Sequence, residues 1–150
     1  MATSRKRLAA EAWGSLLRTQ AALVPRLDAE LRAETGLPLG WYDILLELAG
    51  APEGRLTMTQ LAELVVLSRT RISRVVDDLT AAGLVRREAN AADGRSAFAV
   101  VTPKGRQRFD RAAPVYLAGI ERWFASALTN DELRQIRDVL ERVLTQSAAR

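Results

Sequence analysis

The chain has 150 residues, with 22 Lys and Arg against 18 Asp and Glu, which gives a formal net charge of +4. It contains no Cys and no His, so a disulfide framework, a thiolate zinc site, a thiol redox switch and a Ser-His-Asp triad are all excluded. A chain of this length favours one domain, or at most two small ones that share a core.

The charge is unevenly distributed. Residues 55–108 hold 10 Lys and Arg against 5 Asp and Glu, a balance of +5, whereas the rest of the chain has a balance of −1. A concentrated basic segment is typical of a protein that binds a polyanion. A solvated surface on an Arg-rich protein would give the same balance, so charge alone leaves both readings open.

No targeting or membrane segment is expected. The N-terminus opens basic, but Glu11 interrupts any apolar region, and no apolar run approaches the length that spans a membrane. The absence of Cys fits a reducing compartment. We therefore expect a cytoplasmic protein with no membrane partner.

The first third of the chain reads as helical. Leucines recur at helical spacings over residues 5–34 and predict one long helix, which Gly36 and Pro38 end. Pro25 lies inside this helix and should kink it. Apolar residues at i, i+3, i+4 and i+7 from Trp41 predict a second helix. The six residues that follow it, GAPEGR, are a turn on composition.

Two short helices follow. Thr59 is the predicted N-cap of the first, which covers residues 60–66. The pair at 67–68 interrupts it, and residues 69–82 form the second helix, which Gly83 ends. Two helices joined by so short a turn predict a helix-turn-helix.

The next segment changes its hydrophobic period from helix to strand. LVRRE at 84–88 and SAFAVVT at 96–102 read as strands on either side of the turn-forming residues 89–95. Two extended segments around a loop predict a β-hairpin. Directly after a helix-turn-helix, such a hairpin gives the winged variant of that motif.

The C-terminal third is helical again. Thr102 caps a helix with Pro103 at its first position, which runs to about Ala127 and contains a proline that should bend it. Thr129 and Glu132 then form a capping box for a last amphipathic helix, which continues to residue 147.

These elements give the predicted fold class: mainly α with a small β-hairpin wing (α+β), in one domain over residues 1–150. The winged helix-turn-helix covers residues 38–102, and long helices cover 5–36 and 103–147. Those long helices have apolar faces that the winged region does not cover. We expect them to be buried in a homodimer, while a bundle within one chain is the alternative.

The strongest candidate site is the start of the helix at 69–82. Its periodicity turns one apolar face inward, made of Ile72, Val75, Val76 and Leu79, and leaves polar side chains outward near the N-terminus, where a recognition helix meets base edges. Arginine reads guanine bidentately, and Ser or Thr reaches bases or phosphates. The candidate residues are Ser68, Arg69, Thr70, Arg71, Ser73 and Arg74. An ordinary surface helix with several arginines is the alternative.

The second candidate site is the hairpin tip. Arg95 stands there among small residues, and an arginine on a thin protrusion can enter the minor groove of DNA, where the potential is most negative. Asp93 is expected to hold Arg95 through a salt bridge. A generic surface turn with one charge pair is the alternative reading.

Several motifs between residues 37 and 106 together resemble the MarR family of bacterial transcription regulators. They are WYDILLELA, the helix-turn-helix LAE…LSR…SRVVDDL, GLVRRE, Asp93-Gly94-Arg95 and VVTPKG. The set is specific, although no single piece is. The chain has Gly94 where the family often has a second wing arginine, which leaves Arg95 as the match.

The resemblance implies a homodimer that binds a palindromic operator, commonly as a repressor, and that releases DNA when a small phenolic or carboxylic ligand binds. It also implies roles for particular residues. Arg69, Thr70, Ser73 and Arg74 would face the major groove, Arg95 the minor groove, and Thr59, Ser68, Arg86 and Lys104 the phosphates.

An effector site is also implied, near the junction of the first two helices. Trp13, Trp41 and Tyr42 would stack there on an aromatic ligand, with Arg18 or Arg26 for its carboxylate. Packing in the core is the alternative reading for these aromatic residues. No cofactor and no metal are expected.

Two other classes of function remain to be weighed. The sequence has no Walker loop, no dinucleotide fingerprint and no His or Cys cluster, so we do not expect an enzyme. A degenerate winged helix serving as a protein-interaction or small-molecule-binding module is the other alternative. The Arg, Ser and Thr side chains at the start of the helix at 69–82 favour a DNA-binding regulator.

Overall fold

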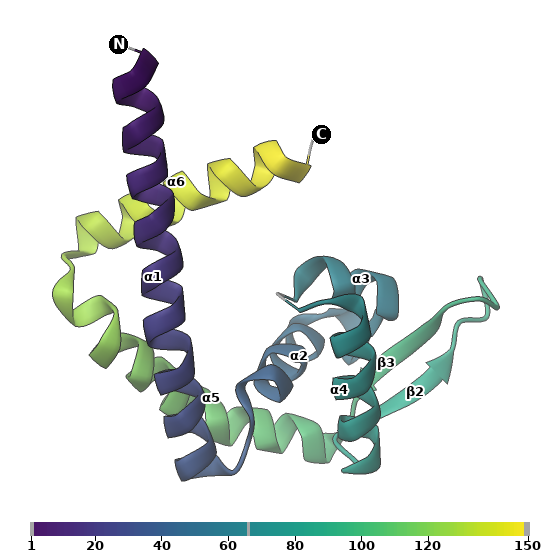
Figure 1. Cartoon of the computed structure of the whole chain (residues 1–150). Helices are drawn as coiled ribbons and strands as arrows, with labels where there is room; N and C mark the ends of the chain where they lie inside the picture. Colours follow the sequence, from purple (N-terminus) through teal and green to yellow (C-terminus); the bar gives the residue numbers. More distant parts are fainter. Residues whose placement is uncertain (1, 66, 149–150) are drawn as a thin grey trace. The chain divides into compact units, whose positions relative to one another are not determined.

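A computed structural model describes residues 2–65 and 67–148 (Figure 1). The helices are α1 (Ala2–Thr35), α2 (Leu39–Gly50), α3 (Met58–Leu64), α4 (Arg69–Ala81), α5 (Pro103–Trp123) and α6 (Asn130–Ala148). The strands are β1 (Arg55–Thr57), β2 (Val85–Ala89) and β3 (Ala97–Val101). This confirms the predicted class, mainly α with a small sheet. No helix in the described part is long and apolar enough to cross a membrane.

The chain forms two compact units. One contains the chain up to Pro25 and the chain from Leu117 onward, and the other is Arg26–Tyr116. The second unit holds the helix-turn-helix and the sheet. In Figure 1 its hairpin of β2 and β3 projects beyond α4.

The second unit is built on one apolar core. Helices α2, α3 and α4, the segment just before α2, and the inner face of the sheet contribute side chains that are almost completely buried. They include Leu37, Ile44, Leu45, Leu48, Leu61, Ile72, Val76, Leu79, Val85 and Ala99. Each large aliphatic side chain buried in this way stabilises the fold by roughly 1.5–3 kcal/mol.

Helix α3 begins two residues earlier than predicted. Its N-cap is Thr57, whose Oγ1 accepts from the backbone N–H of Gln60 at 3.1 Å, while the Gln60 side chain accepts from the Thr57 N–H at 2.8 Å. The prediction of Thr59 as the N-cap is therefore wrong: Thr59 lies inside the first turn, because the capping box needs Gln three residues after the cap. Val66, the last residue predicted for this helix, lies outside the described residues.

The predicted hairpin is confirmed, and it is part of a three-stranded antiparallel sheet in the order β1-β3-β2. The third strand, β1, was not predicted, because Arg55 was placed in a turn and three residues are too few to show a period. Leu56 pairs with Ala99, and Ala99 pairs with Arg87. These three residues define the inner face of the sheet, which carries the buried Leu56 and Ala99.

The start of α5 is fastened to the turn between α4 and β2. As predicted, Thr102 caps α5, and its Oγ1 accepts from the Gly105 N–H at 3.0 Å. The same hydroxyl donates to the carbonyl of Gly83 at 2.7 Å, and the Lys104 ammonium donates to the carbonyl of Ala82 at 3.0 Å. Gly105 lies so close to this turn that a Cβ would overlap the carbonyl group of Leu84.

The C-terminal helices differ from the prediction at one boundary. Helix α5 ends at Trp123 rather than near Ala127, and a 3₁₀ turn over Ala125–Ala127 follows. The predicted capping box is confirmed: the Glu132 carboxylate accepts from the Thr129 N–H at 2.7 Å, and the Thr129 hydroxyl accepts from the Glu132 N–H at 3.3 Å.

Candidate nucleic-acid interface

The first two turns of α4 present a polar surface to solvent. Of the predicted apolar face, Ile72, Val76 and Leu79 are buried and Val75 is partly buried, which turns the opposite side of the helix outward. Ser68 is the N-cap, and its hydroxyl accepts from the backbone N–H of Arg71 at 3.3 Å. The exposed side chains are Ser68, Arg69, Thr70, Arg71, Ser73 and Arg74. An exposed face with three arginines has the composition of a recognition helix.

A groove of about 280 Å³ runs between α3 and α4. It brings together three of the residues named from the sequence, Thr59, Arg69 and Ser73. The other residues that line it are Met58, Ala62, Ile72 and Arg87. The two helices of the motif thus share one surface with polar groups from both.

Arg87 was missed in the sequence analysis. Its side chain reaches from β2 to α4, where Nη2 donates to Asp77 Oδ1 at 2.6 Å. This ion pair ties the hairpin to the recognition helix. The alternation of the strand could have revealed it, because Arg87 is two residues after the buried Val85 and so shares its face.

The loop at the hairpin tip is held by its own side chains. The Asn90 carbonyl oxygen accepts from the Ala92 N–H at 3.1 Å, and the Asn90 amide donates to the Ser96 hydroxyl at 3.0 Å. Asp93 accepts from the backbone N–H of Arg95 at 3.0 Å. In the described part of the chain, Asp93 therefore shapes the turn instead of forming the expected salt bridge with Arg95, whose side chain is exposed.

The two other basic residues assigned to phosphates have acceptors within the protein. Arg86 Nη1 donates to Glu88 at 2.6 Å, on the face of the sheet opposite to Arg87. Lys104 donates to the carbonyl at the C-terminus of α4. Both side chains are exposed, but neither belongs to the groove between α3 and α4. Their phosphate contacts remain a prediction.

The ion pairs separate the arginines of the sheet from those of α4 and the wing tip. Arg55, Arg86 and Arg87 each pair with a carboxylate. Within residues 2–65 and 67–148, no carboxylate pairs with Arg69, Arg71, Arg74 or Arg95. These four guanidinium groups can therefore meet a polyanion without first breaking an ion pair.

The residues predicted for an effector lie in different units. Trp13, at 62% exposed, and Arg18, whose guanidinium donates to Ser15 at 3.4 Å, belong to the first unit. Trp41, partly buried, and Tyr42, at 3% exposed, belong to the second. The effector site therefore stays a prediction.

The ring of Tyr42 is already in contact with other aromatic side chains. Its centroid lies 5.3 Å from that of Phe109 and 4.8 Å from that of Tyr116. Burial, together with the neighbouring Asp43 charge, raises the pKa of Tyr42 above its ordinary value. Tyr42 thus packs in the core of its own unit, which is the alternative reading given for it from the sequence.

Asp43 gives the core a pH dependence. Burial, and secondly the charge of Glu47, raises the pKa of the Asp43 carboxyl to about 6. The folded state therefore binds a proton at Asp43 more tightly than the unfolded chain does. The stabilisation that comes from this proton is fully present below about pH 4, the ordinary pKa of an Asp carboxyl. It is lost as the pH rises through about 6.

We expect Asp43→Asn to raise the free energy of unfolding at pH 8 by about 1–2 kcal/mol, since a half-buried charge is replaced by a neutral isostere. The gain should shrink as the pH falls from 8 to 5. Urea unfolding at both pH values measures this, with Asp110→Asn, at an exposed carboxylate of the same unit, as the control. A gain that is equal at the two pH values would contradict the assignment.

The elements define a class of protein. Two short helices with a tight turn, a recognition helix with an exposed arginine face, and a hairpin carrying an arginine at its tip make a winged helix-turn-helix. Among the described residues, no group of His, Cys, Asp and Glu could hold a metal ion.

Comparisons with known proteins agree with this class. The sequence profile of the MarR family matches residues 35–96. The solved structure of AbsC, a MarR family transcriptional regulator from Streptomyces coelicolor, is 29% identical with a TM-score of 0.83, and the match covers 93% of each chain. No curated protein sequence matches the chain.

A second similar structure was solved with DNA. It is Sco3205, a MarR family transcriptional regulator from Streptomyces coelicolor in complex with DNA, which is 31% identical with a TM-score of 0.82. The match covers 89% of this chain and 84% of that protein. BldR from Sulfolobus solfataricus, at 23% identity and a TM-score of 0.82, has the same fold. The chain belongs to the MarR family of transcriptional regulators.

Proposed function

We propose that this chain is a transcriptional regulator that binds a palindromic operator as a homodimer, with α4 in the major groove and the wing in the minor groove. The observation that carries the proposal is that, among the described residues, no carboxylate pairs with the three arginines at the start of α4 or with Arg95 at the tip of the wing. The DNA in the Sco3205 structure supports it by similarity.

The charges favour DNA over other partners. Arg69 and Arg74 lie on the exposed face of α4, where bidentate contacts to guanine are available, and Arg95 lies on a thin hairpin that fits a narrow groove. A protein-interaction module built on the same fold would not require these unpaired arginines. A gel shift with the DNA that flanks the gene is the direct test, and failure to bind any duplex would overturn the proposal.

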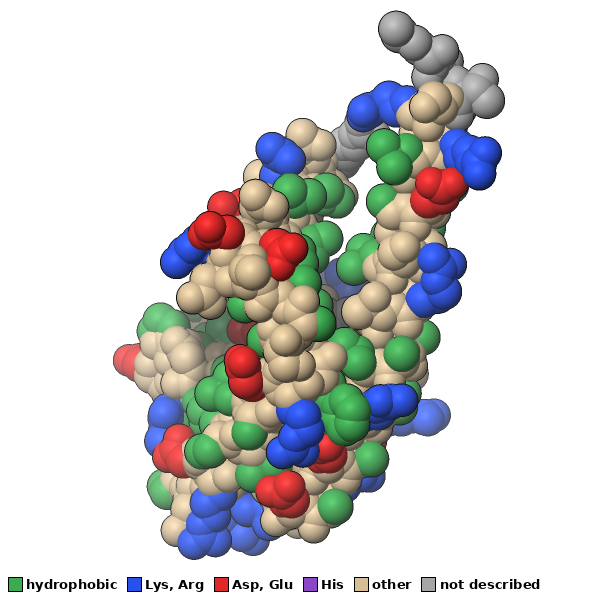
Figure 2. Space-filling model, turned by 90° about the vertical axis from the view of Figure 1, so that its left-hand side faces the viewer, with side chains coloured by type: hydrophobic (Ala, Val, Ile, Leu, Met, Phe, Trp, Pro, Cys, Tyr) green, Lys and Arg blue, Asp and Glu red, His purple; other side chains and the backbone are tan. Residues whose placement is uncertain are grey.

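The first unit supports the homodimer. On α6, no residue is fully buried, and Val143 and Leu144 are 53% and 68% exposed. On α1, Leu8 and Trp13 are 66% and 62% exposed. Figure 2 shows such hydrophobic side chains open to solvent on one face of the molecule. A second copy of the chain would remove these apolar faces from water.

We expect Leu144→Asp to convert a dimer to a monomer without unfolding it, because the side chain is exposed in a single chain and is buried only by a partner. Thr145→Asp, about 100° around α6 from Leu144 and outside its apolar face, is the matched control and should leave the dimer intact. Sedimentation equilibrium measures both. A wild type that sediments as 16.5 kDa at micromolar concentration would contradict the homodimer.

Repression and release by an effector belong to the same proposal. A repressor would occupy an operator near its target promoter and leave when a small aromatic or carboxylate ligand binds, with Trp13 and Arg18 of the first unit as the proposed contacts. The protein would act in the cytoplasm without a cofactor and without enzymatic activity. Calorimetric titration with salicylate tests the ligand class, and binding that Trp13→Ala leaves unchanged would count against these contacts.

DNA binding should depend steeply on salt. A dimer presents two sets of four arginines without carboxylate partners, and each cation that neutralises a phosphate releases a counterion. For six to ten such contacts, affinity falls by about 10³-fold or more between 50 and 200 mM salt. Fluorescence anisotropy over this range measures the slope, and an affinity that does not change with salt would contradict the proposed interface.

A further inference from the structure

The outer face of the sheet carries a cluster of charged side chains that the recognition helix does not explain. The outer face is the one opposite to the face that carries Leu56 and Ala99. The strand register places two rows of residues across the outer face. The rows are Arg55, Val100 and Arg86, and Thr57, Phe98 and Glu88. Val100, on the central strand of this face, is 5% exposed.

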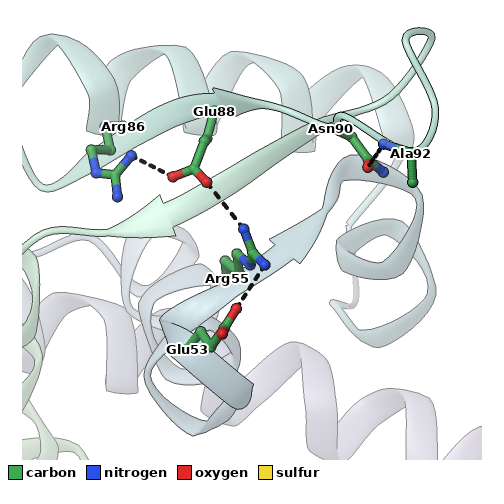
Figure 3. Close-up of polar contacts among 6 residues, drawn as sticks. All are labelled: Glu53, Arg55, Arg86, Glu88, Asn90 and Ala92. Carbon is green, nitrogen blue, oxygen red and sulfur yellow. Dashed lines mark hydrogen bonds and ion pairs between the residues drawn. The ribbon is translucent and has the colours of Figure 1, made fainter.

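Arg55 spans the width of the sheet. From the edge strand β1, its Nη1 donates to Glu88 on the other edge strand, β2, at 3.0 Å (Figure 3). Its guanidinium carbon lies 4.5 Å from the centroid of the Phe98 ring on the central strand β3. Glu53, just before β1, binds the Nη2 of the same guanidinium at 2.7 Å. One side chain thus connects all three strands.

Glu88 joins this contact to a second arginine. Its other carboxylate oxygen accepts from Arg86 at 2.6 Å, so Glu88 binds two guanidinium groups (Figure 3). These contacts hold the pKa of Glu88 below its ordinary value. The main cause is the hydrogen bond from Arg86, and the positive charges of Arg86 and Arg55 add to it. The side chains of Arg55 and Glu88 are 35% and 36% exposed, so water screens the pair only in part.

The cluster lies where the sheet narrows. Thr57, Phe98 and Glu88 form the last row in which three strands pair, and beyond them β2 and β3 continue only to the pair of Ala89 and Ala97. A two-stranded ribbon twists easily and has little stability of its own. The direction of the wing tip therefore depends on how the hairpin is held at this row.

We propose that Arg55 is a positioning residue for the wing: by binding Glu88 and covering Phe98 at the base of the free hairpin, it sets the direction in which Arg95 approaches DNA. This inference rests on the proposed DNA-binding function. Arg55 is neutralised by Glu53 and Glu88. It therefore acts through the hairpin and does not contact a phosphate itself.

The test is a double-mutant cycle between Arg55 and Arg95. Arg55→Ala is made in the wild type and in the Arg95→Ala variant, and affinity is measured for the duplex that the wild type selects from a random pool. We expect a loss of about threefold to tenfold in the wild type, the size typical of a partly exposed ion pair with a cation–π contact. In the Arg95→Ala background the loss should nearly disappear, because the contact that Arg55 positions is already gone.

Two further measurements separate positioning from other roles. In the Arg95→Ala background, replacing Arg55 should leave the slope of affinity against salt unchanged, whereas a further reduction of the slope there would show a direct phosphate contact by Arg55 and overturn the inference. Hydrogen exchange of the amides in residues 90–96 should become faster in Arg55→Ala. An equal loss of affinity in both backgrounds, or no loss in either, would also overturn it.

The controls keep the two proposals distinct. Arg32→Ala removes an arginine that is ion-paired with Asp28 at 2.8 Å in the same unit, and it should leave affinity and exchange unchanged. If Arg55→Ala lowers the melting temperature strongly, Phe98→Leu, which keeps an apolar residue under Arg55, carries the same cycle. A wild type that binds no duplex overturns the proposed function, whereas a wild type that binds and an Arg55→Ala variant that binds equally well overturn only this inference.

Discussion

The single variants Arg69→Ala and Arg74→Ala should each bind the operator about 5- to 150-fold more weakly than the wild type. This factor corresponds to about 1–3 kcal/mol for a lost bidentate contact to a base. Both side chains are exposed on the first turns of α4, and in the part of the chain that the structure describes neither is paired with a carboxylate that it would have to leave in order to reach DNA. The variants should also lose base preference at one position of each half-site.

Arg95→Ala should behave differently, because the wing is expected to read groove width and not base identity. Its loss of affinity should be largest for duplexes with A·T-rich flanks, where the minor groove is narrow, while the preference at central positions stays intact. The wild type should select an inverted repeat with half-sites about one helical turn apart.

A binding-site selection on the wild type and these three variants checks the whole assignment. The matched control is Arg87→Ala, since this arginine lines the same groove but is paired with Asp77 at 2.6 Å. It should weaken binding with little change in base preference. The assignment fails if Arg69→Ala, Arg74→Ala and Arg95→Ala lose preference at the same positions, or if the wild type selects a site without two-fold symmetry.

Much of the fold could be predicted from local signals. The buried face of α4, the hairpin and the Thr129 and Glu132 capping box each follow from residues within one or two turns of one another, and the structure has them as expected. The N-cap of α3 shows where such a signal was misread. Thr57 and Thr59 are both suitable caps, but only Thr57 has Gln60 three residues later.

The features that could not be predicted depend on strand register. The pair of Arg55 and Glu88 joins residues 33 apart in sequence, and the pair of Arg87 and Asp77 joins residues 10 apart. The alternation of β2 indicates that Arg87 shares the face of the buried Val85, but it does not indicate that Asp77 of α4 lies beside Arg87. Sequence composition therefore located the basic surface, while the structure identified which of its charges are already paired.

Gly105→Ala should strongly destabilise the protein. A Cβ at this position would overlap the backbone carbonyl group of Leu84 and would also press against the Val101 side chain. Since backbone cannot rotate away as a flexible side chain can, either α5 or the turn after α4 must shift. We expect a cost of about 3 kcal/mol, which lowers the melting temperature of a chain of this size by about 10 °C.

The same shift should reach DNA binding, because the displaced turn is the one that holds the C-terminus of α4. Thr102 and Lys104 would lose their hydrogen bonds to the carbonyls of Gly83 and Ala82 as α5 moves away. Gly50→Ala is the matched control: nothing lies within 4 Å of its added Cβ, and the residue ends a helix. Differential scanning calorimetry measures both variants, and the melting temperature of Gly50→Ala should equal that of the wild type. A Gly105→Ala variant that melts within about 2 °C of the wild type would contradict the expected steric overlap with Leu84.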